Sequence, residues 1–168
     1  MHFGSNPRAI LYEKTIADII PNQPIIVEFY VTNLLRTTYN ATPPNITIAL
    51  VDQLGNEITI NYPPKRIVSI VPSQTELLFD LGLDDEVIGI TKFCIHPIEK
   101  FASKTKIGGT KKLLIEKIRD LKPDLIIGNK EENTQSEVEL LMQEFPVWMS
   151  DISNLEEAML TITQIGEL

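Results

Sequence analysis

The stretch RIVSIVPSQTELLFDLGLDDEVIGIT, residues 66–91, decides the fold. It opens with the apolar run 66–71 and closes with the apolar run 86–91, and short runs of this kind are typical of strands. Between them, apolar residues recur at helical intervals: Leu77, Leu78 and Leu81. Ser73 and Glu76 have the spacing of a capping box, which predicts where that helix begins. The stretch therefore predicts a strand, a helix and a second strand.

The same alternation continues toward the C-terminus. Residues 124–129 and 146–151 are further strand candidates. Two more capping boxes precede apolar residues at helical spacing: Thr134 with Glu137, and Ser153 with Glu156. Strands that are apolar on both faces and alternate with amphipathic helices indicate a parallel sheet covered on both sides. The predicted fold class is α/β, a Rossmann-like parallel sheet lobe with helices on both faces, preceded by a small β-rich N-terminal segment.

A Pro/Asn cluster, NATPPN, marks a boundary because it cannot continue a helix or a central strand. Before it, PIIVEFYV (24–31) is typical of a strand, but residues 1–45 indicate nothing more specific and form an extension of unknown role. After it, residues 45–61 predict a β-hairpin around a turn at Leu54-Gly55-Asn56. We therefore expect one domain over residues 46–168.

Bulk properties argue against several functions. The chain has 168 residues, and its apolar runs are far shorter than the roughly 20 residues that span a bilayer. A net charge of −8 without a basic stripe argues against a nucleic-acid partner. The single cysteine, Cys94, argues against a disulfide framework and a multi-cysteine zinc site. The N-terminus lacks the basic and apolar pattern of a signal peptide, so either the protein stays in the cytoplasm or an export signal lies outside this sequence, and the compartment stays open.

Ligands of such sheets bind beyond the carboxyl ends of the strands. That rule nominates the loops containing VPSQTE, TKFCIHP, NKEEN and SDIS. Phe93, in the second loop, is an aromatic side chain that can stack on a flat ligand. Glu131 and Glu132 are adjacent in an extended segment, so they point in opposite directions and form a poor acid–base pair. Two interpretations stay open for them: solvated acids near a helix N-terminus, or residues at the lip of a cleft.

No constellation of catalytic residues is recognisable in the sequence. Cys94 and His96 are too few for zinc unless carboxylates join, and they lack an orienting partner for nucleophilic catalysis, so we interpret them as ligand-loop residues. KIGGTKK (106–112) matches no phosphate-loop pattern, and its glycines favour a tight turn before a helix. Ser73 has no nucleophile elbow around it, which favours helix capping. We therefore predict that the protein is not an enzyme and holds neither a metal nor a catalytic cofactor.

Several motifs in order carry a family resemblance. They are RIVSIVPSQTE, LGL followed by VIGIT, KIGG, LKPDLII and PVW. Over residues 46–168 the chain resembles the N-terminal lobe of the helical-backbone (class III) substrate-binding proteins of ABC importers, which serve vitamin B12, ferric siderophores and haem. The resemblance implies two Rossmann-like lobes with the ligand held between them. It also implies that residues 154–168 begin the long helix that joins the lobes, and that the second lobe is absent from this sequence.

The resemblance implies roles for individual residues. Phe93 falls where the vitamin-B12-binding members place an aromatic side chain against the corrin. Glu116 is similar in position to the surface acid that docks on arginines of the permease, although an ordinary exposed helix glutamate is an equal alternative. The residues implied to line the ligand cleft are Pro72, Ser73, Gln74, Phe93, Cys94, His96, Lys130, Glu131, Glu132 and Asn133.

The sequence therefore predicts the ligand-binding component of an ABC importer for cobalamin or an iron chelate, either a siderophore or haem. We expect a monomer whose partners are the permease and the transported small molecule. The resemblance implies a periplasmic or cell-surface protein, whereas the sequence pattern leaves the cytoplasm open. Two rival hypotheses stay open: a cytoplasmic Rossmann-like enzyme that takes catalytic residues from another part of the protein, and a scaffold lobe that holds no ligand.

Overall fold

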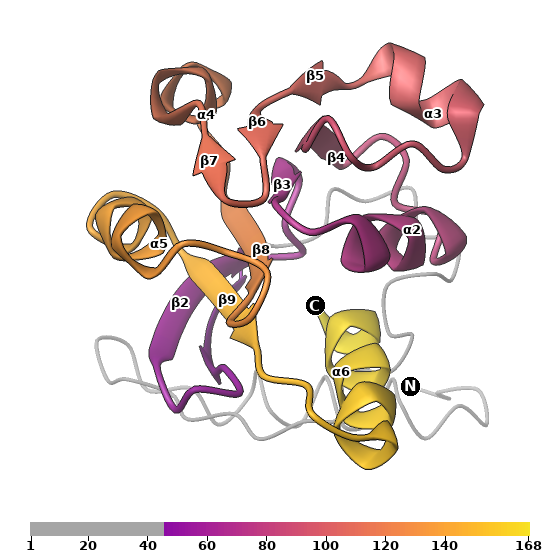
Figure 1. The fold of residues 1–168 in the computed structure, drawn as a ribbon. Coiled ribbons are helices and arrows are strands. Elements are labelled where there is room, and N and C mark those ends of the chain that lie inside the picture. The colour runs from indigo at the N-terminus through magenta and orange to yellow at the C-terminus, as the bar shows by residue number, and fades with distance from the viewer. Residues whose placement is uncertain (1–45) are drawn as a thin grey trace, which may run out of the picture. The chain divides into compact units, whose positions relative to one another are not determined.

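The structure, a computed structural model, describes residues 46–168 (Figure 1). The predicted strand at 24–31 and the rest of the extension at 1–45 lie outside the described residues. No helix within 46–168 is long and apolar enough to cross a membrane.

One parallel sheet lies at the centre of the described chain. Its strands are β3 (Ile67–Ser69), β4 (Val87–Ile90), β5 (Thr105–Lys106), β8 (Leu125–Asn129) and β9 (Val147–Ser150). They are hydrogen-bonded in the order β5-β4-β3-β8-β9, and every neighbouring pair is parallel. The α/β prediction and all its sheet strands are confirmed, and β5 extends the sheet by a two-residue edge strand that the sequence pattern did not indicate.

Helices cover both faces of this sheet. Their bounds are α2 (Pro72–Asp80), α3 (Ile98–Ser103), α4 (Ile115–Leu121), α5 (Gln135–Met142) and α6 (Leu155–Glu167). Figure 1 shows α4 and α5 on one face and α2 and α6 on the other. The two-sided cover explains why the strand sequences are apolar at nearly every position.

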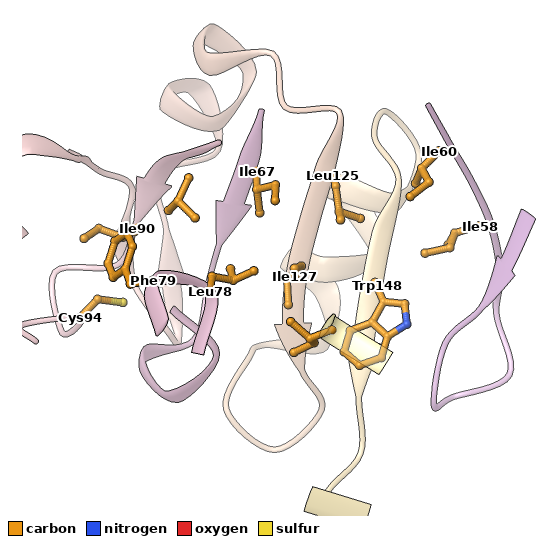
Figure 2. Packing of buried hydrophobic residues seen from close by; sticks show 12 residues of the cluster. Ile58, Ile60, Ile67, Leu78, Phe79, Ile90, Cys94, Leu125, Ile127 and Trp148 are labelled. Atoms are coloured by element: carbon orange, nitrogen blue, oxygen red, sulfur yellow. The ribbon is translucent and has the colours of Figure 1, made fainter. Parts of the chain in front are cut away.

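The core has two parts because successive strand residues point to opposite faces of the sheet. In β8, Leu125 and Ile127 belong to the cluster beneath α2 and α6, and Ile126 belongs to the cluster beneath α4 and α5. Figure 2 shows the first cluster, in which Trp148 of β9 lies beside Ile127 and is only 2% exposed. The alternation repeats on each central strand, so the sheet is buried from both sides.

A β-hairpin flanks the sheet, as predicted. It consists of β1 (Ile46–Val51) and β2 (Glu57–Tyr62), which pair antiparallel. The Asp52 carboxylate accepts hydrogen bonds from the backbone N–H groups of Leu54 and Asn56 at 2.9 and 2.7 Å, and Gly55 has φ of +83°. The turn thus uses a buried carboxylate and a glycine in the conformation that glycine favours.

Gln53, in the hairpin turn, holds the hairpin against the end of β9 and against α6. Its backbone N–H donates to the carbonyl of Met149 at 3.0 Å, and its side-chain oxygen accepts from the N–H of Asp151 at 2.8 Å. Its amide nitrogen donates to Thr161 at 2.9 Å and to Gln164 at 2.8 Å, both in α6. One polar side chain therefore fixes the loop between β9 and α6.

The three predicted capping boxes are wrong in their hydrogen bonds. Ser73 lies inside the first turn of α2, which begins at Pro72 without a side-chain cap. Thr134 does occupy the position before α5, but its hydroxyl donates to the carbonyl of Lys111 at 2.9 Å. At α6 the cap is Asn154, one residue later than predicted, and it accepts from the backbone N–H of Glu157 at 2.9 Å. Tertiary partners and the N-terminal proline displaced the local pattern.

Candidate functional site

The sheet order identifies the carboxyl edge of the sheet as the place to look for a ligand site. From β3 the chain continues to β4 on one side, and it returns to β8 on the other side, so the strand order switches at β3. Loops that follow adjacent strands on either side of such a switch diverge and leave room for a ligand. The predicted loops after β3, β4, β8 and β9 all emerge at this edge because the strands are parallel.

The Asn133 side chain connects three segments at this edge by hydrogen bonds: the ends of β3 and β8 and the hairpin over residues 108–113. Its side-chain oxygen accepts from the backbone N–H of Asn129 at 2.8 Å. Its amide nitrogen donates to the carbonyls of Ile70 at 3.0 Å and Thr110 at 3.1 Å. Asn133 is 5% exposed, and these bonds occupy its oxygen and both amide hydrogens. The structure therefore gives this predicted ligand contact an internal role.

The two adjacent glutamates lie on a loop whose backbone is fixed. The side-chain oxygen of Asn129 accepts from the backbone N–H groups of Glu131 at 2.9 Å and Glu132 at 3.1 Å. Both glutamate side chains are exposed. Lys130, also exposed, forms an ion pair with Asp151 at 2.7 Å, and the hydrogen bond to that carboxylate raises the pKa of Lys130. The loop is rigid at its backbone and leaves its acidic side chains in solvent.

Gln74 connects the first turn of α2 to the end of β9. Its amide nitrogen donates to the hydroxyl of Ser150, and that hydroxyl also accepts from the amide of Asn129 at 3.0 Å. Gln74 is 3% exposed, and its side-chain oxygen has no hydrogen-bond partner among the described residues. Of the neighbouring predicted contacts, Pro72 is half-buried and Ser73 is exposed. The first turn of α2 therefore presents Ser73 outward and turns Gln74 inward.

The loop after β4 separates its predicted contacts in the same way. Cys94 is fully buried, with its sulfur 3.2 Å from the hydroxyl of Thr75 and 3.1 Å from that of Thr91. Its thiol thus belongs to the core and does not line the surface of the loop. His96 is exposed. Phe93 keeps 53% of its surface exposed, so its ring is not part of the core, where phenylalanine side chains are commonly buried.

An open groove of about 530 Å³ runs beside Phe93. Its other wall is the hairpin of β6 (Gly108–Gly109) and β7 (Lys112–Leu113), where the sequence predicted a tight turn. The residues that line the groove are Lys92, Phe93, Gly108, Gly109, Thr110, Lys111, Lys112 and Leu114. Of these, only Phe93 was predicted, although the lysines next to the glycine pair were a visible signal.

Glycines give this hairpin its shape. Gly108 has φ of +105°, and a Cβ atom there would lie 2.5 Å from the carbonyl oxygen of Lys112. A Cβ atom on Gly109 would lie 2.9 Å from the Phe93 ring, so the ring packs directly on the glycine backbone. The hairpin contacts the aromatic ring, the ammonium group of Lys92 lies 5.0 Å from the ring centre, and 53% of the residue stays exposed.

Metal-binding residues do not gather in the part of the chain that the structure describes: no group of three or more His, Cys, Asp or Glu side chains there is suited to hold an ion. Glu116, the predicted docking residue, lies in the first turn of α4 with its side chain 83% exposed. It forms an ion pair with Arg119 at 2.5 Å, and Arg119 also binds Glu144.

The curated relatives of this chain include proteins from Bacillus and Vibrio. An ABC transporter substrate-binding lipoprotein of Bacillus subtilis, YvrC, is 36% identical over 83 residues, which are 49% of this chain and 26% of that protein. The vitamin B12-binding protein of Vibrio campbellii is 31% identical over 108 residues, which are 64% of this chain and 39% of that protein. The chain thus spans less than half the length of these relatives.

A solved structure shows the same arrangement of strands and helices. The petrobactin-binding protein YclQ from Bacillus subtilis superposes with a TM-score of 0.64 at 26% identity, over 73% of this chain and 45% of that one. The periplasmic binding protein family matches residues 67–168, more than half of the sequence and everything from β3 to α6. The resemblance that the motifs carried is confirmed, and the chain belongs to the periplasmic binding protein family.

Proposed function

We propose that this chain supplies the N-terminal lobe of the ligand-binding component of an ABC importer. The proposed cargo is cobalamin or an iron chelate, either a siderophore or haem, and the protein binds it without turnover. Relatives named for vitamin B12 and for petrobactin support this choice of cargo. The observation that carries the proposal is the half-exposed ring of Phe93 beside an open groove at the carboxyl edge of the sheet.

The groove suits one side of a large, partly flat ligand. Its volume of about 530 Å³ lies within the range of roughly 300–1,000 Å³ that small-molecule sites occupy. The Phe93 ring contacts Gly109 and keeps about half of its surface exposed, so its exposed part can pack against a flat ligand. Because the groove is open, the proposal includes a second lobe that closes over the ligand, with α6 as the start of the connecting helix.

The remaining contacts follow from which predicted residues are accessible. We propose that Ser73, His96, Glu131 and Glu132 meet the ligand or the second lobe, since all four side chains are exposed. Gln74, Cys94 and Asn133 support the site from below, since all three are buried.

The proposal also covers the partner and the location of the protein. Glu116 is exposed at the start of α4, where a permease arginine has access to it. Arg119 holds that carboxylate in place and would have to release it or share it on docking. The proposed location is the periplasm or the cell surface, and the likeness to a substrate-binding lipoprotein supports it.

Isothermal titration calorimetry of the intact protein tests this proposal. The probes are cyanocobalamin, haemin and ferric siderophores, and at least one of them is expected to bind. Phe93→Ala is expected to weaken that binding about tenfold or more, because it removes a stacking surface worth about 1.5 kcal/mol beyond its buried area. Leu140→Ala, on α5 and outside the groove, is the control and should bind as the wild type does. If none of these probes binds to the intact protein, the proposed function is wrong.

A further inference from the structure

Three lysines line the groove, and none of its lining residues within 46–168 is acidic. Lys92, Lys111 and Lys112 are all exposed, and they lie in a chain whose net charge is −8. A local concentration of positive charge on an acidic protein is a departure from the bulk composition. The positive charge of the groove would attract a negatively charged ligand and stabilise its binding.

Two of these lysines, Lys112 of the hairpin and Lys92 of the loop after β4, lie on the side of the groove that Phe93 occupies. Gly109 of β6 pairs with Lys112 of β7, and paired residues of antiparallel strands point to the same face. That face is the one where the Phe93 ring packs on Gly109. Lys92 lies there too, with its ammonium nitrogen 5.0 Å from the centre of the Phe93 ring. The aromatic surface is thus flanked by two cationic side chains.

Carboxylates of the described part of the chain do not neutralise these charges. Among residues 46–168, no carboxylate lies within 4 Å of the ammonium group of Lys92, Lys111 or Lys112. By contrast, Lys130 is paired with Asp151, and Lys100 is paired with Asp84.

Lys111 is turned toward the neighbouring loop. Its ammonium group donates to the backbone carbonyl of Glu131, which uses one of its three N–H bonds and leaves its charge uncompensated. The charge of Lys111 therefore stays at the rim of the groove, next to the loop after β8.

We infer that this groove selects a polyanionic ligand, one that presents several catecholate or carboxylate oxygens beside a flat apolar surface. The inference rests on the proposed function and narrows its cargo to negatively charged iron chelates rather than corrinoids without net charge. Lysine ammonium groups on flexible stems suit such a ligand, since they adjust to oxygens in more than one arrangement.

The test compares ligands that differ in charge, two of which share ferric iron. The intact protein is titrated with a trianionic ferric tricatecholate, a ferric trihydroxamate without negative charge, and cyanocobalamin. The tricatecholate is expected to bind at least about tenfold tighter than either other probe, and its Kd should rise as salt is added, because salt screens exposed charges. Haemin, with two carboxylates, distinguishes carboxylate from catecholate recognition.

Variants connect the selectivity to the lysines. Lys92→Gln and Lys112→Gln should each weaken tricatecholate binding about two- to fivefold, the effect of one exposed charge pair. The triple Lys92, Lys111 and Lys112 to Gln variant should weaken it more than tenfold and flatten the salt dependence. Lys117→Gln, on α4 and outside the groove, is the matched control.

The outcomes separate this inference from the proposed function. If the uncharged probes bind as tightly as the tricatecholate, or if the triple variant binds it like the wild type, the charge selection is wrong while the binding function stands. If no probe binds at all, both are wrong.

Discussion

Replacing Asn133 by alanine is expected to destabilise the protein strongly. The side chain holds the end of β3, the β6–β7 hairpin and the end of β8 together through hydrogen bonds to Ile70, Thr110 and Asn129. These three partners are at most 8% exposed, so water cannot easily replace the lost bonds. An unpartnered buried N–H at Asn129 costs about 1–3 kcal/mol, and each carbonyl loses about 1 kcal/mol. The free energy of unfolding should therefore fall by about 3–5 kcal/mol.

Urea unfolding followed by circular dichroism measures this change. The midpoint should move to lower urea with an unchanged slope, since the surface exposed on unfolding stays the same. Asn61→Ala is the control: Asn61 is exposed on β2, and its side chain accepts one long bond of 3.4 Å, so the loss should stay within about 0.5 kcal/mol. A loss below about 1 kcal/mol for Asn133→Ala would refute the reasoning.

Asn133→Asp separates the hydrogen bonds from the volume of the side chain. Aspartate has nearly the same shape and still accepts from the N–H of Asn129, but it cannot donate to the two carbonyls. A buried carboxylate facing two carbonyl oxygens should destabilise the protein at least as much as alanine does. A neutral effect would mean that the two hydrogen bonds from Asn133 to the carbonyls of Ile70 and Thr110 contribute nothing to stability.

Three further predictions concern the hairpin and two helix ends. Gly108→Ala should destabilise by about 3 kcal/mol in urea unfolding, since φ is +105° and the new Cβ would meet a backbone oxygen, whereas Gly55→Ala, at φ of +83° in open space, should cost about 1 kcal/mol. Asn154→Ala should lower the free energy of unfolding by about 1 kcal/mol, because it removes the N-cap of α6. Calorimetry measures this as a lower Tm, and an unchanged Tm would show that the cap does not stabilise the protein. Hydrogen bonds from Arg119 lower the pKa of Glu144, so their stabilisation is present above the ordinary glutamate pKa and is lost as the pH falls through the lowered one. The difference in unfolding free energy between wild type and Glu144→Gln should shrink in acid, and a pH-independent difference would contradict this.

The sheet could be predicted because its signal is local and repeated. In residues 125–127 each side chain is apolar, and the structure shows why: neighbouring positions serve different helical layers. The caps of the helices were harder to predict, because a capping side chain can bind more than one partner. The hydroxyl of Thr134 is an example. The capping pattern offered it a backbone N–H of its own helix, and the fold brought the carbonyl of Lys111 within 2.9 Å. Only the tertiary structure decides between such competitors.

The site, too, was predictable where it depends on strand topology and unpredictable where it depends on tertiary contacts. Topology placed the loops after β3, β4 and β8 at one edge, and that part of the prediction depended only on parallel strands. Which side chain of a loop faces outward depends on a few dihedral angles, and so Phe93 is exposed while the adjacent Cys94 is buried. The lysines beside the glycine pair were missed because the motif was compared with phosphate loops alone. Short hairpins such as β6–β7 have too few residues to show a period.

The whole chain contains one cysteine and one tryptophan, and both belong to the same apolar cluster of the core. A thiol reagent can reach Cys94 only when that cluster opens, and the indole of Trp148 meets solvent in the same event. The natural sequence therefore carries two independent optical and chemical reporters of a single cooperative transition. It also offers a silent background, so that one cysteine introduced at the rim of the groove can be labelled alone in the folded protein.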